Sequence, residues 1–412
     1  MTRQTLRLVL LVSCAHAMVH VFELSFPAVE ELIAGEYGVG ADTTGLMGNL
    51  WRFPFGLGAL AAGWLVDRYG AKWLLTIYLW GCAACCIAAW LSPEAASLPL
   101  LFAVMFCMGT FASIYHPAGL ALISHEAPPH VRAKALGIHG VFGSAGIAAA
   151  PFIAGLVLSW LTWRQFYLVL SIPGFLLGLL IASMLKEHHR QPTESTGAAD
   201  TDEDNGNWKA FFILASSGAI FGFIYAALMN FLPRYLGDLP LRDDINAWLA
   251  NGTSGGLQDK AFRNFATGGV LLVGMAGQYI AGSIARPGKQ ERQLGTVIVT
   301  TAPFLVAMAF AEGNWRLVSA AIVSLVLFMQ QPLYNSLIAD FVPRRRRSLG
   351  YGFSNMMSFG VGSFGAWYAG SVLENAEHGR AIAYSSLAGL ALVGGAIAFW
   401  LGRWRLRHSN DA

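Results

Sequence analysis

Long apolar runs recur along the chain, and short turns rich in charged residues, Gly and Pro separate them. About 20 apolar residues in an α-helix are enough to cross the hydrocarbon core of a bilayer. The first six runs predict helices at 6–33, 44–66, 73–91, 97–124, 135–159 and 163–185. A second set is predicted at 209–236, 263–285, 293–312, 315–341, 350–373 and 381–402. We therefore expect an all-α integral membrane protein with twelve transmembrane helices.

A hydrophilic segment separates the two sets of helices. Residues 186–208 contain many charged and few apolar side chains, which is typical of a linker. We expect three parts, namely an N-terminal six-helix half at 1–185, a linker at 186–208 and a C-terminal six-helix half at 209–412. A shift of 215 residues places Pro117 on Pro332 and Gly137 on Gly352. The two halves are therefore predicted to be pseudo-symmetric copies of one unit.

The composition agrees with a membrane protein and narrows its function. Hydrophobic residues make up 55% of the chain and charged residues 12%, whereas soluble proteins carry about a quarter charged residues. The net charge is only +3 and the basic residues lie in short loops, so we expect a lipid bilayer and no nucleic acid as partner. A membrane-embedded enzyme would need an activated nucleophile or a complete metal site, and we expect neither enzyme activity nor a cofactor.

The basic residues also predict the orientation of the chain. Of the 27 Lys and Arg residues, 19 lie on the side that both termini share, seven lie on the other side, and Arg52 lies inside a helix. Because cytoplasmic loops are enriched in Lys and Arg, we expect both termini and the linker in the cytoplasm. The 237–262 loop then faces the periplasm, with a short surface helix at 242–249. The first apolar run continues to Ile33, which predicts a retained helix rather than a cleaved signal peptide.

The loop after the second predicted helix carries a ten-residue motif. Its positions Gly63, Asp67, Arg68, Gly70 and Lys72 match the pattern G-x-L-x-D-R-x-G-x-K. This motif, its place in a cytoplasmic loop and the twofold repeat resemble the major facilitator superfamily. The resemblance implies a twelve-helix transporter that works by alternating access on a small molecule, as a monomer in a bacterial inner membrane. It also implies that the motif latches the cytoplasmic face shut.

The fifth predicted helix carries a second pattern of small residues. Gly137, Gly146, Pro151 and Gly155 are similar to the G-x8-G-x3-G-P-x2-G-G motif of proton-coupled antiporters in this superfamily, although Ala stands at 150 and 154. The similarity favours export. Close packing of helices on small residues is the alternative explanation of the same glycines.

The fourth predicted helix contains Tyr115, His116 and Pro117. This stretch resembles the H-P element of fosmidomycin-resistance-type transporters in the superfamily. On that resemblance we assign Tyr115 and His116 to substrate binding.

Three ionisable residues share one face of the first predicted helix. His16, His20 and Glu23 follow i, i+4, i+7 spacing, so they fall within a stripe of roughly 60°. An ionisable side chain at membrane depth costs about 3 kcal/mol or more and normally faces a bundle interior. We assign these three residues to proton coupling. Pro27 shares the stripe and is expected to break the helix near its outer end.

Arg52 lies at a similar predicted depth in the second helix. It precedes Asp67 by 15 residues, which is about 22 Å along a helix. Glu23 lies 16 residues beyond Arg7, which is about 24 Å. We therefore expect an ion pair between Glu23 and Arg52, with Arg52 as the counter-charge or as the anchor of an anionic substrate.

Two alternatives for this set stay open. The ion pair can be structural and only hold the first two helices together. In the other alternative His16 and His20 bind a transition metal, with Met18 or Cys14 nearby. Met18 and Cys14 point away from the stripe, so we assign no metal site.

The second half offers hydrogen-bonding residues in its predicted helices. We assign to substrate binding, together with Arg52, the residues Asn230, Arg234, Gln278, Gln331, Asn335 and Asn355. Gln331 is the repeat partner of His116. His125 and His139 are left without a role.

These observations predict a proton-coupled secondary transporter that exports a small anionic or zwitterionic molecule by proton antiport. The alternatives are a proton-coupled importer of a carboxylate metabolite or metal chelate, and a transition-metal transporter that uses His16 and His20. The partners expected are protons, a small-molecule substrate and the bilayer.

Overall fold

The computed structural model describes residues 1–93, 98–185, 206–250, 258–286, 288–343 and 346–408. All regular secondary structure in these residues is helical. Most of the predicted linker lies outside the described residues. Within the described residues, ten helical runs are long and apolar enough to cross a membrane. Two further helical runs in the described chain do not meet this criterion of length and hydropathy. One is α2, which carries Asn49 and Arg52, and the other is an interrupted run near the C-terminus.

The first half consists of six spans built from seven helices. They are α1 (Arg3–Tyr37), α2 (Ala41–Tyr69), α3 (Ala71–Trp90), α4 (Leu98–Ala112), α5 (Tyr115–Glu126), α6 (Pro129–Leu158) and α7 (Trp163–Met184). Helices α4 and α5 together form the fourth span. Gly70 ends α2 and precedes α3 with a φ of 85°, a conformation that favours glycine and allows the tight turn inside the loop motif.

The second half repeats this arrangement. Its helices are α8 (Trp208–Tyr235), α9 (Leu241–Ala250), α10 (Asp259–Ile284), α11 (Gln290–Phe310), α12 (Trp315–Phe341), α13 (Arg347–Asn355), the π-helix η2 (Met356–Gly360), the 3-10 helix η3 (Val361–Ser363), α14 (Phe364–Asn375) and α15 (Gly379–His408). The run from α13 to α14 forms the eleventh span. The twelve predicted spans are confirmed, and α9 is the predicted short helix of the long loop.

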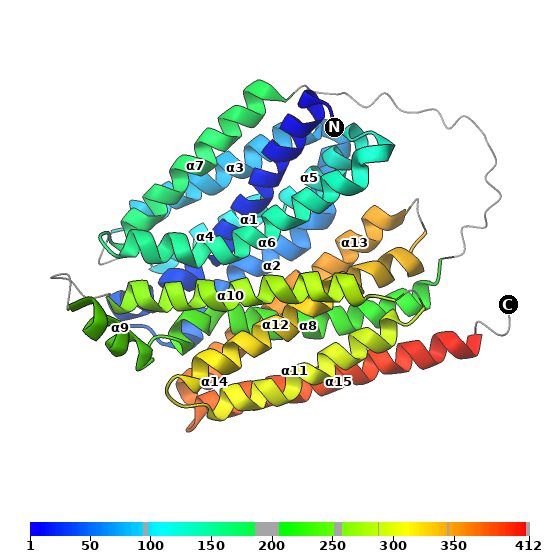
Figure 1. The fold of residues 1–412 in the computed structure, drawn as a ribbon. Coiled ribbons are helices and arrows are strands. Elements are labelled where there is room, and N and C mark those ends of the chain that lie inside the picture. Colours follow the sequence, from blue (N-terminus) through cyan, green and yellow to red (C-terminus); the bar gives the residue numbers. More distant parts are fainter. Residues whose placement is uncertain (94–97, 186–205, 251–257, 287, 344–345, 409–412) are drawn as a thin grey trace, which may run out of the picture.

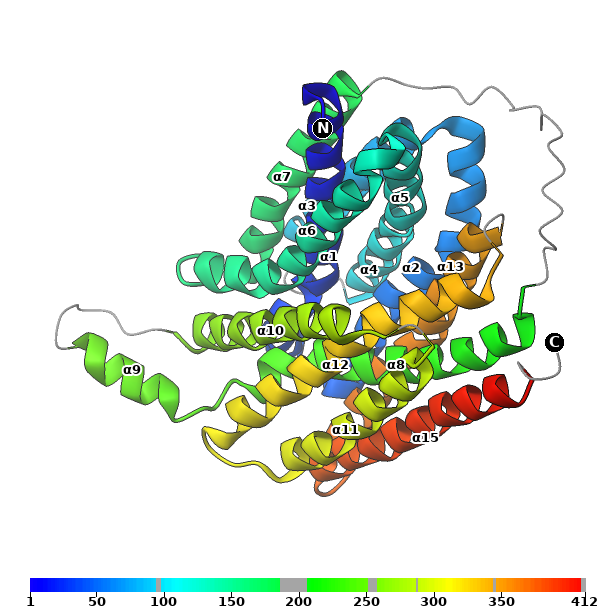
Figure 2. The same ribbon diagram turned by 45° about the vertical axis from the view of Figure 1, so that its right-hand side comes forward.

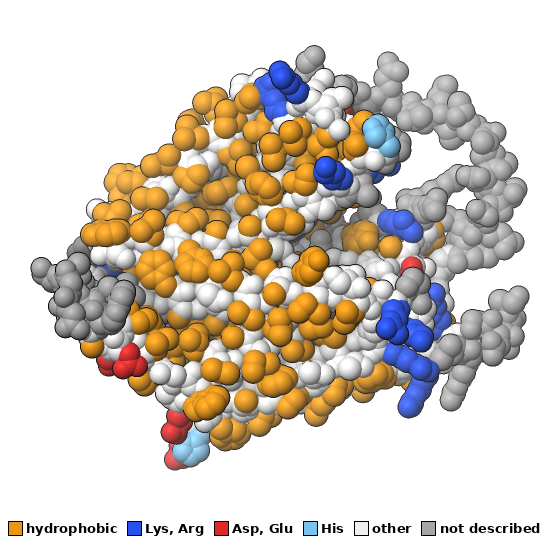
Figure 3. Space-filling view, in the orientation of Figure 1, with side chains coloured by type: hydrophobic (Ala, Val, Ile, Leu, Met, Phe, Trp, Pro, Cys, Tyr) orange, Lys and Arg blue, Asp and Glu red, His pale blue; other side chains and the backbone are white. Residues whose placement is uncertain are grey.

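The two halves lie side by side and diverge toward the end that carries the termini (Figures 1 and 2). Apolar side chains cover the middle of the molecule, and most Lys and Arg side chains visible in Figure 3 lie near the termini. The same view shows a hollow between the halves at that end. At the opposite end, near α9, the halves are held together.

Three of the helices differ from the sequence prediction. Pro27 does not break α1, which continues from Arg3 to Tyr37. A proline removes one backbone donor, and the rest of the long buried helix keeps its hydrogen bonds. The fourth span, in contrast, is interrupted at Ser113 and Ile114. The eleventh span contains a π turn, a feature that often marks functional positions.

Contacts between the halves at the closed end are polar and specific. Arg234 of α8 donates from Nε and Nη2 to the Glu30 carboxylate at 3.0 and 2.8 Å. Asn264 of α10 donates to the Ala28 carbonyl at 2.9 Å. Arg263 of α10 pairs with Glu31 of α1. These bonds join α1 to the second half away from the termini.

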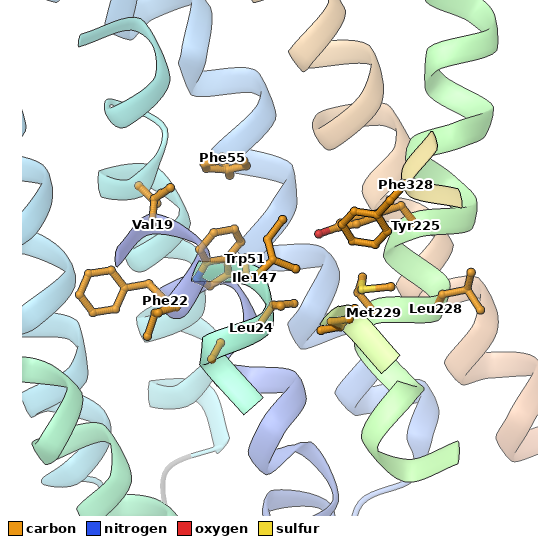
Figure 4. Packing of buried hydrophobic residues seen from close by; sticks show 14 of the residues in the cluster. Val19, Phe22, Leu24, Trp51, Phe55, Ile147, Tyr225, Leu228, Met229 and Phe328 are labelled. Carbon is orange, nitrogen blue, oxygen red and sulfur yellow. The ribbon is translucent and has the colours of Figure 1, made fainter. Parts of the chain in front are cut away.

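An apolar core fills the middle of the interface. Figure 4 shows Trp51 and Phe55 of α2 on one side and Tyr225, Met229 and Phe328 on the other, all of them buried. Close helix approach relies on glycine, since a side chain on Gly56 would meet the backbone of Gly360 in the other half. The core therefore holds the halves in contact around the site described next.

Candidate functional site

The predicted stripe of α1 is buried and faces the bundle interior. His16 is 9% exposed, His20 7% and Glu23 1%. The ring of His20 donates from Nδ1 to Glu23 Oε2 at 2.8 Å. The spacing argument from the sequence therefore identified three residues that do lie together.

The ion pair between Glu23 and Arg52 is confirmed. Arg52 Nη2 lies 3.2 Å from Glu23 Oε1, and both side chains are almost fully buried. The Arg52 guanidinium also lies 5.8 Å from the ring centroid of Tyr225, which belongs to α8 in the second half. Arg52 Nε has no hydrogen-bond partner among the described residues. The charged network of the first half thus reaches the interface with the second half.

His116 joins this network from the fourth span. The break between α4 and α5 places His116 in the first turn of α5. Its ring centroid lies 5.4 Å from that of His16 and 5.9 Å from that of His20. Ligand atoms of the three rings all lie within 4.8 Å of one another. No described side chain forms a hydrogen bond with the His116 ring, which is partly exposed.

His139 of α6 is a member of the cluster that the sequence analysis did not assign. Its ring stacks on His16 with centroids 4.1 Å apart. Its Nε2 lies 2.7 Å from the Tyr115 hydroxyl. The His139 carbonyl accepts a hydrogen bond from His16 Nδ1 at 2.8 Å. His139 and Gly143 are one turn apart on α6, and a side chain on Gly143 would meet the His16 ring, so the close approach of α6 to α1 brings His139 to the cluster.

The predicted residues of the second half separate into two groups. Gln278 and Gln331 meet, with 2.5 Å between Gln278 Nε2 and Gln331 Oε1, and the Ser144 hydroxyl of α6 donates to Gln278. Asn335 is exposed on α12 and Asn355 is half-buried at the end of α13. These residues lie on the helices that border the hollow.

Asn230 and Arg234 on α8 lie elsewhere. Asn230 is fully buried against Gly48, and neither of its amide atoms has a partner among the described residues. Arg234 lies in the ion pair with Glu30 at the closed end. It sits two and a half turns beyond Tyr225, so the structure does not bring it to the central cluster.

The residues of the loop motif lie at the end of α2 and the start of α3. Arg68 is exposed, with its guanidinium 5.4 Å from the centroid of the Trp64 ring. Lys72 lies 4.9 Å from the ring centroid of Trp73. The side chain of Asp67, and that of His125, lie outside the described residues.

The glycines of α6 divide by what they contact. A side chain on Gly146 would meet the backbone of Ala17, and one on Gly155 would meet Phe265 of α10. Gly137 faces open space, and so does Gly63 of the loop motif. Pro151 lies within the continuous helix α6. Close packing therefore accounts for Gly146 and Gly155 but not for Gly137.

A family model for the Major Facilitator Superfamily matches residues 10–366. The chain belongs to the major facilitator superfamily. It is therefore a multi-pass integral membrane protein of a family of small-molecule transporters.

Curated members of the superfamily show relationships of limited identity. The chain is 23% identical over 313 residues to the probable sulfoacetate transporter SauU of Cupriavidus necator. The aligned residues cover 66% of this chain and 71% of that protein. It is 24% identical over 181 residues to the drug efflux pump JefA of Mycobacterium tuberculosis, covering 43% of this chain but only 34% of the relative. The match to the second relative thus spans about a third of that protein.

Solved structures of the superfamily share the fold. A bacterial homolog of the human lysosomal transporter Spinster, in an inward-facing and unoccupied conformation, aligns with a TM-score of 0.74 at 14% identity, covering 99% of this chain and 98% of that one. The peptide transporter POT in complex with sulfate aligns with a TM-score of 0.74 at 13% identity, covering 97% and 95%.

Proposed function

We propose that this major facilitator protein is a proton-coupled secondary transporter that exports a small zwitterionic molecule by proton antiport. The observation that carries the proposal is the buried network of His20, Glu23 and Arg52, which ends against Tyr225 of the other half. A carboxylate in this position holds or releases a proton, and each state changes the charge presented to the second half. Alternating access then moves the site between the two sides of the membrane.

The charge distribution supports a definite orientation. Lys and Arg gather near the termini (Figure 3), and cytoplasmic loops carry such an excess. We place both termini in the cytoplasm of a bacterium, with the chain acting as a monomer in the inner membrane. The hollow then opens to the cytoplasm, and the Glu30 to Arg234 pair closes the periplasmic side. In this arrangement the loop motif around Arg68 latches the cytoplasmic face in the opposite state.

The hollow would supply the path of the substrate. Gln331 and Asn335 are exposed on α12, Gln278 of α10 bonds to Gln331, and Asn355 is half-buried at the end of α13. Together with Tyr115, His116 and Arg52 of the first half, they would surround a small polar molecule. Neutral amides bind by hydrogen bonds and do not compete for the proton.

Charge balance at Glu23 and Arg52 distinguishes antiport from symport. A zwitterion places its acidic end on Arg52 and its ammonium on Glu23, where it displaces the proton. Substrate and proton then exclude each other, which is the condition for exchange. A pure anion takes Arg52 from Glu23, and Glu23 then binds a proton to avoid a buried unpaired charge. Anion and proton would therefore travel together.

The small-residue pattern of α6 favours export, and one relative is a drug efflux pump. A second candidate is import of an organic anion by symport, which the probable sulfoacetate transporter among the relatives favours. The two candidates predict opposite proton movements for the same direction of substrate flow.

The test uses purified protein in proteoliposomes that contain a pH-sensitive dye. Taurine and sulfoacetate serve as matched probes, because both carry a sulfonate but only taurine carries an ammonium group. Outflow of taurine should be accompanied by proton entry. Sulfoacetate should move with the proton if the symport candidate is right. Glu23→Gln should abolish the proton signal, since an amide does not exchange a proton in this range.

Glu36→Gln is the matched control. Glu36 lies on the same helix and pairs with an arginine, Arg164, but at the exposed end and within one half. This variant should keep the proton signal. The proposal fails if neither probe moves protons, or if Glu23→Gln and the parent protein give the same signal.

A further inference from the structure

The three imidazoles around the stripe of α1 have the arrangement of metal ligands. His16, His20 and His116 come from two different spans, and their ligand atoms lie within 4.8 Å of one another. Three nitrogen ligands bound at 2.0 to 2.1 Å in a tetrahedral zinc site lie roughly 3.4 Å apart. Binding of an ion would therefore require the rings to turn toward one another. The His116 ring forms no hydrogen bond with any described side chain, so its ring nitrogens are not committed to another partner there.

The outer hydrogen bonds of the rings direct the remaining nitrogen atoms. His16 Nδ1 is bonded to the carbonyl of His139, and His20 Nδ1 to the Glu23 carboxylate. Both partners only accept hydrogen bonds, so Nδ1 carries the hydrogen in each ring. In a neutral ring, Nε2 then carries a lone pair. Metal-binding histidines almost always donate their other N–H to a backbone carbonyl or a carboxylate in this way.

We propose that His16, His20 and His116 bind a divalent transition-metal ion through their ring nitrogens, with a fourth position open toward the hollow. As a statement about binding the proposal stands alone, and as a statement about cargo it rests on the proposed transport function. Imidazole ligands select zinc, copper, nickel and iron over magnesium and calcium. His116 replaces Met18 and Cys14, the further ligands considered from the sequence, because the break after α4 brings its ring to α1.

The charge around the site indicates what fills the fourth position. Three neutral imidazoles leave two positive charges on the ion, and Glu23, the nearest carboxylate, is already paired with Arg52. An uncompensated charge at this depth is costly. An anionic ligand on the open position lowers that cost, so the ion either gains an anion at the site after arriving free or arrives as a complex with a carboxylate chelator.

The binding test uses the purified full chain in detergent, without an affinity tag. No proton gradient is present, and Co2+ is the probe. One Co2+ per chain should bind and show the strong visible absorption of a tetrahedral site, and Zn2+ should displace it. His16→Ala, His20→Ala and His116→Ala should each weaken binding at least tenfold, and Glu23→Gln about tenfold. His130→Ala is the control, because His130 is exposed at the start of α6 and should leave binding unchanged.

His116→Cys keeps the proposal testable if an alanine variant does not fold. A thiolate at this position should bind Co2+ and add a sulfur-to-metal absorption band in the near ultraviolet. Absence of that band in folded protein, failure of the parent chain to bind one Co2+, or unchanged binding in all three alanine variants would overturn the proposal.

Citrate distinguishes the two forms of the ion. Labelled citrate retained by the protein only when Zn2+ and His116 are present supports binding as a complex. Zn2+ binding that citrate merely competes away supports the free ion. The proton assay with taurine is run with a chelator present, so it succeeds or fails independently of this site.

Discussion

The two halves of the molecule share one fold but differ in chemistry at their centres. In the first half, Glu23 and Arg52 form a buried ion pair, and His116 joins the stripe histidines beside it. The residues of the second half that were assigned to the site include amides such as Gln278 and Gln331, which bond to each other. His116 of the first half and Gln331 of the second half occupy equivalent positions in the repeat. Duplication therefore preserved the scaffold, while ionisable chemistry is concentrated in one copy.

This asymmetry has a physical advantage for a transporter. A charge that changes at the centre of one half alters the attraction between that half and the uncharged side chains opposite it. Tyr225 is the place where the second half meets this charge, 5.8 Å from Arg52. In the proposed mechanism the first half binds the proton and the second half responds by moving.

The largest effect on stability is expected from a variant that breaks the charge balance of the first half. Arg52→Ala leaves Glu23 buried without its counter-charge, so we expect a loss of about 3–5 kcal/mol of stability at neutral pH. Gln331→Ala removes only a hydrogen bond between exposed amides and should cost about 1 kcal/mol or less. Unfolding in detergent with a denaturant series measures both.

The double variant Glu23→Gln with Arg52→Gln is the control for charge. It removes both charges together and should recover much of the stability lost in Arg52→Ala. Equal losses for Arg52→Ala and Gln331→Ala would show that the two halves do not differ in this respect.

A smaller effect on stability is expected from helix packing at two equivalent repeat positions. Gly146 lies against the Ala17 backbone, whereas its repeat position in the second half, Val361, is 48% exposed. Gly146→Val forces α6 away from α1 and should cost about 1–3 kcal/mol. Val361→Ala should change stability by about 0.5 kcal/mol or less. Thermal unfolding of the two variants is the measurement, and similar shifts in midpoint would contradict the packing difference.

The smallest effect concerns the contact between the halves. Glu30→Gln removes a charge-assisted bond to Arg234 and should weaken the closed end by about 1–2 kcal/mol. The closed and open populations then shift several-fold toward opening on the side of α9. Pairs of spin labels on α1 and α8 report this distance.

Glu36→Gln is the comparison within one half. Glu36 pairs with Arg164 of α7, so its loss does not bear on the separation of the halves. The spin-label distances should stay as in the parent protein. A shift of equal size in both variants would mean that the Glu30 pair does not hold the halves together.

Much of the fold follows from the sequence because long apolar runs have one solution in a bilayer. Backbone groups must be satisfied within the helix, so span positions are predicted to within a few residues. Pro27 misled the prediction, since one missing hydrogen bond does not end a buried helix of 35 residues. The break before His116 and the π turn at Met356–Gly360 were not predicted. Both are set by packing between helices rather than by a local residue signal.

The sequence by itself determined which residues share a face of one helix. His16, His20 and Glu23 lie together because the α-helix has a fixed period, and Arg52 matches their depth because the rise per residue is fixed. Relations between helices have no such period. The approach of His116, the stacking of His139 on His16 and the diversion of Arg234 to Glu30 were decided by the tertiary structure. Rotation and tilt of packed helices depend on every contact along them, and no local pattern encodes that sum.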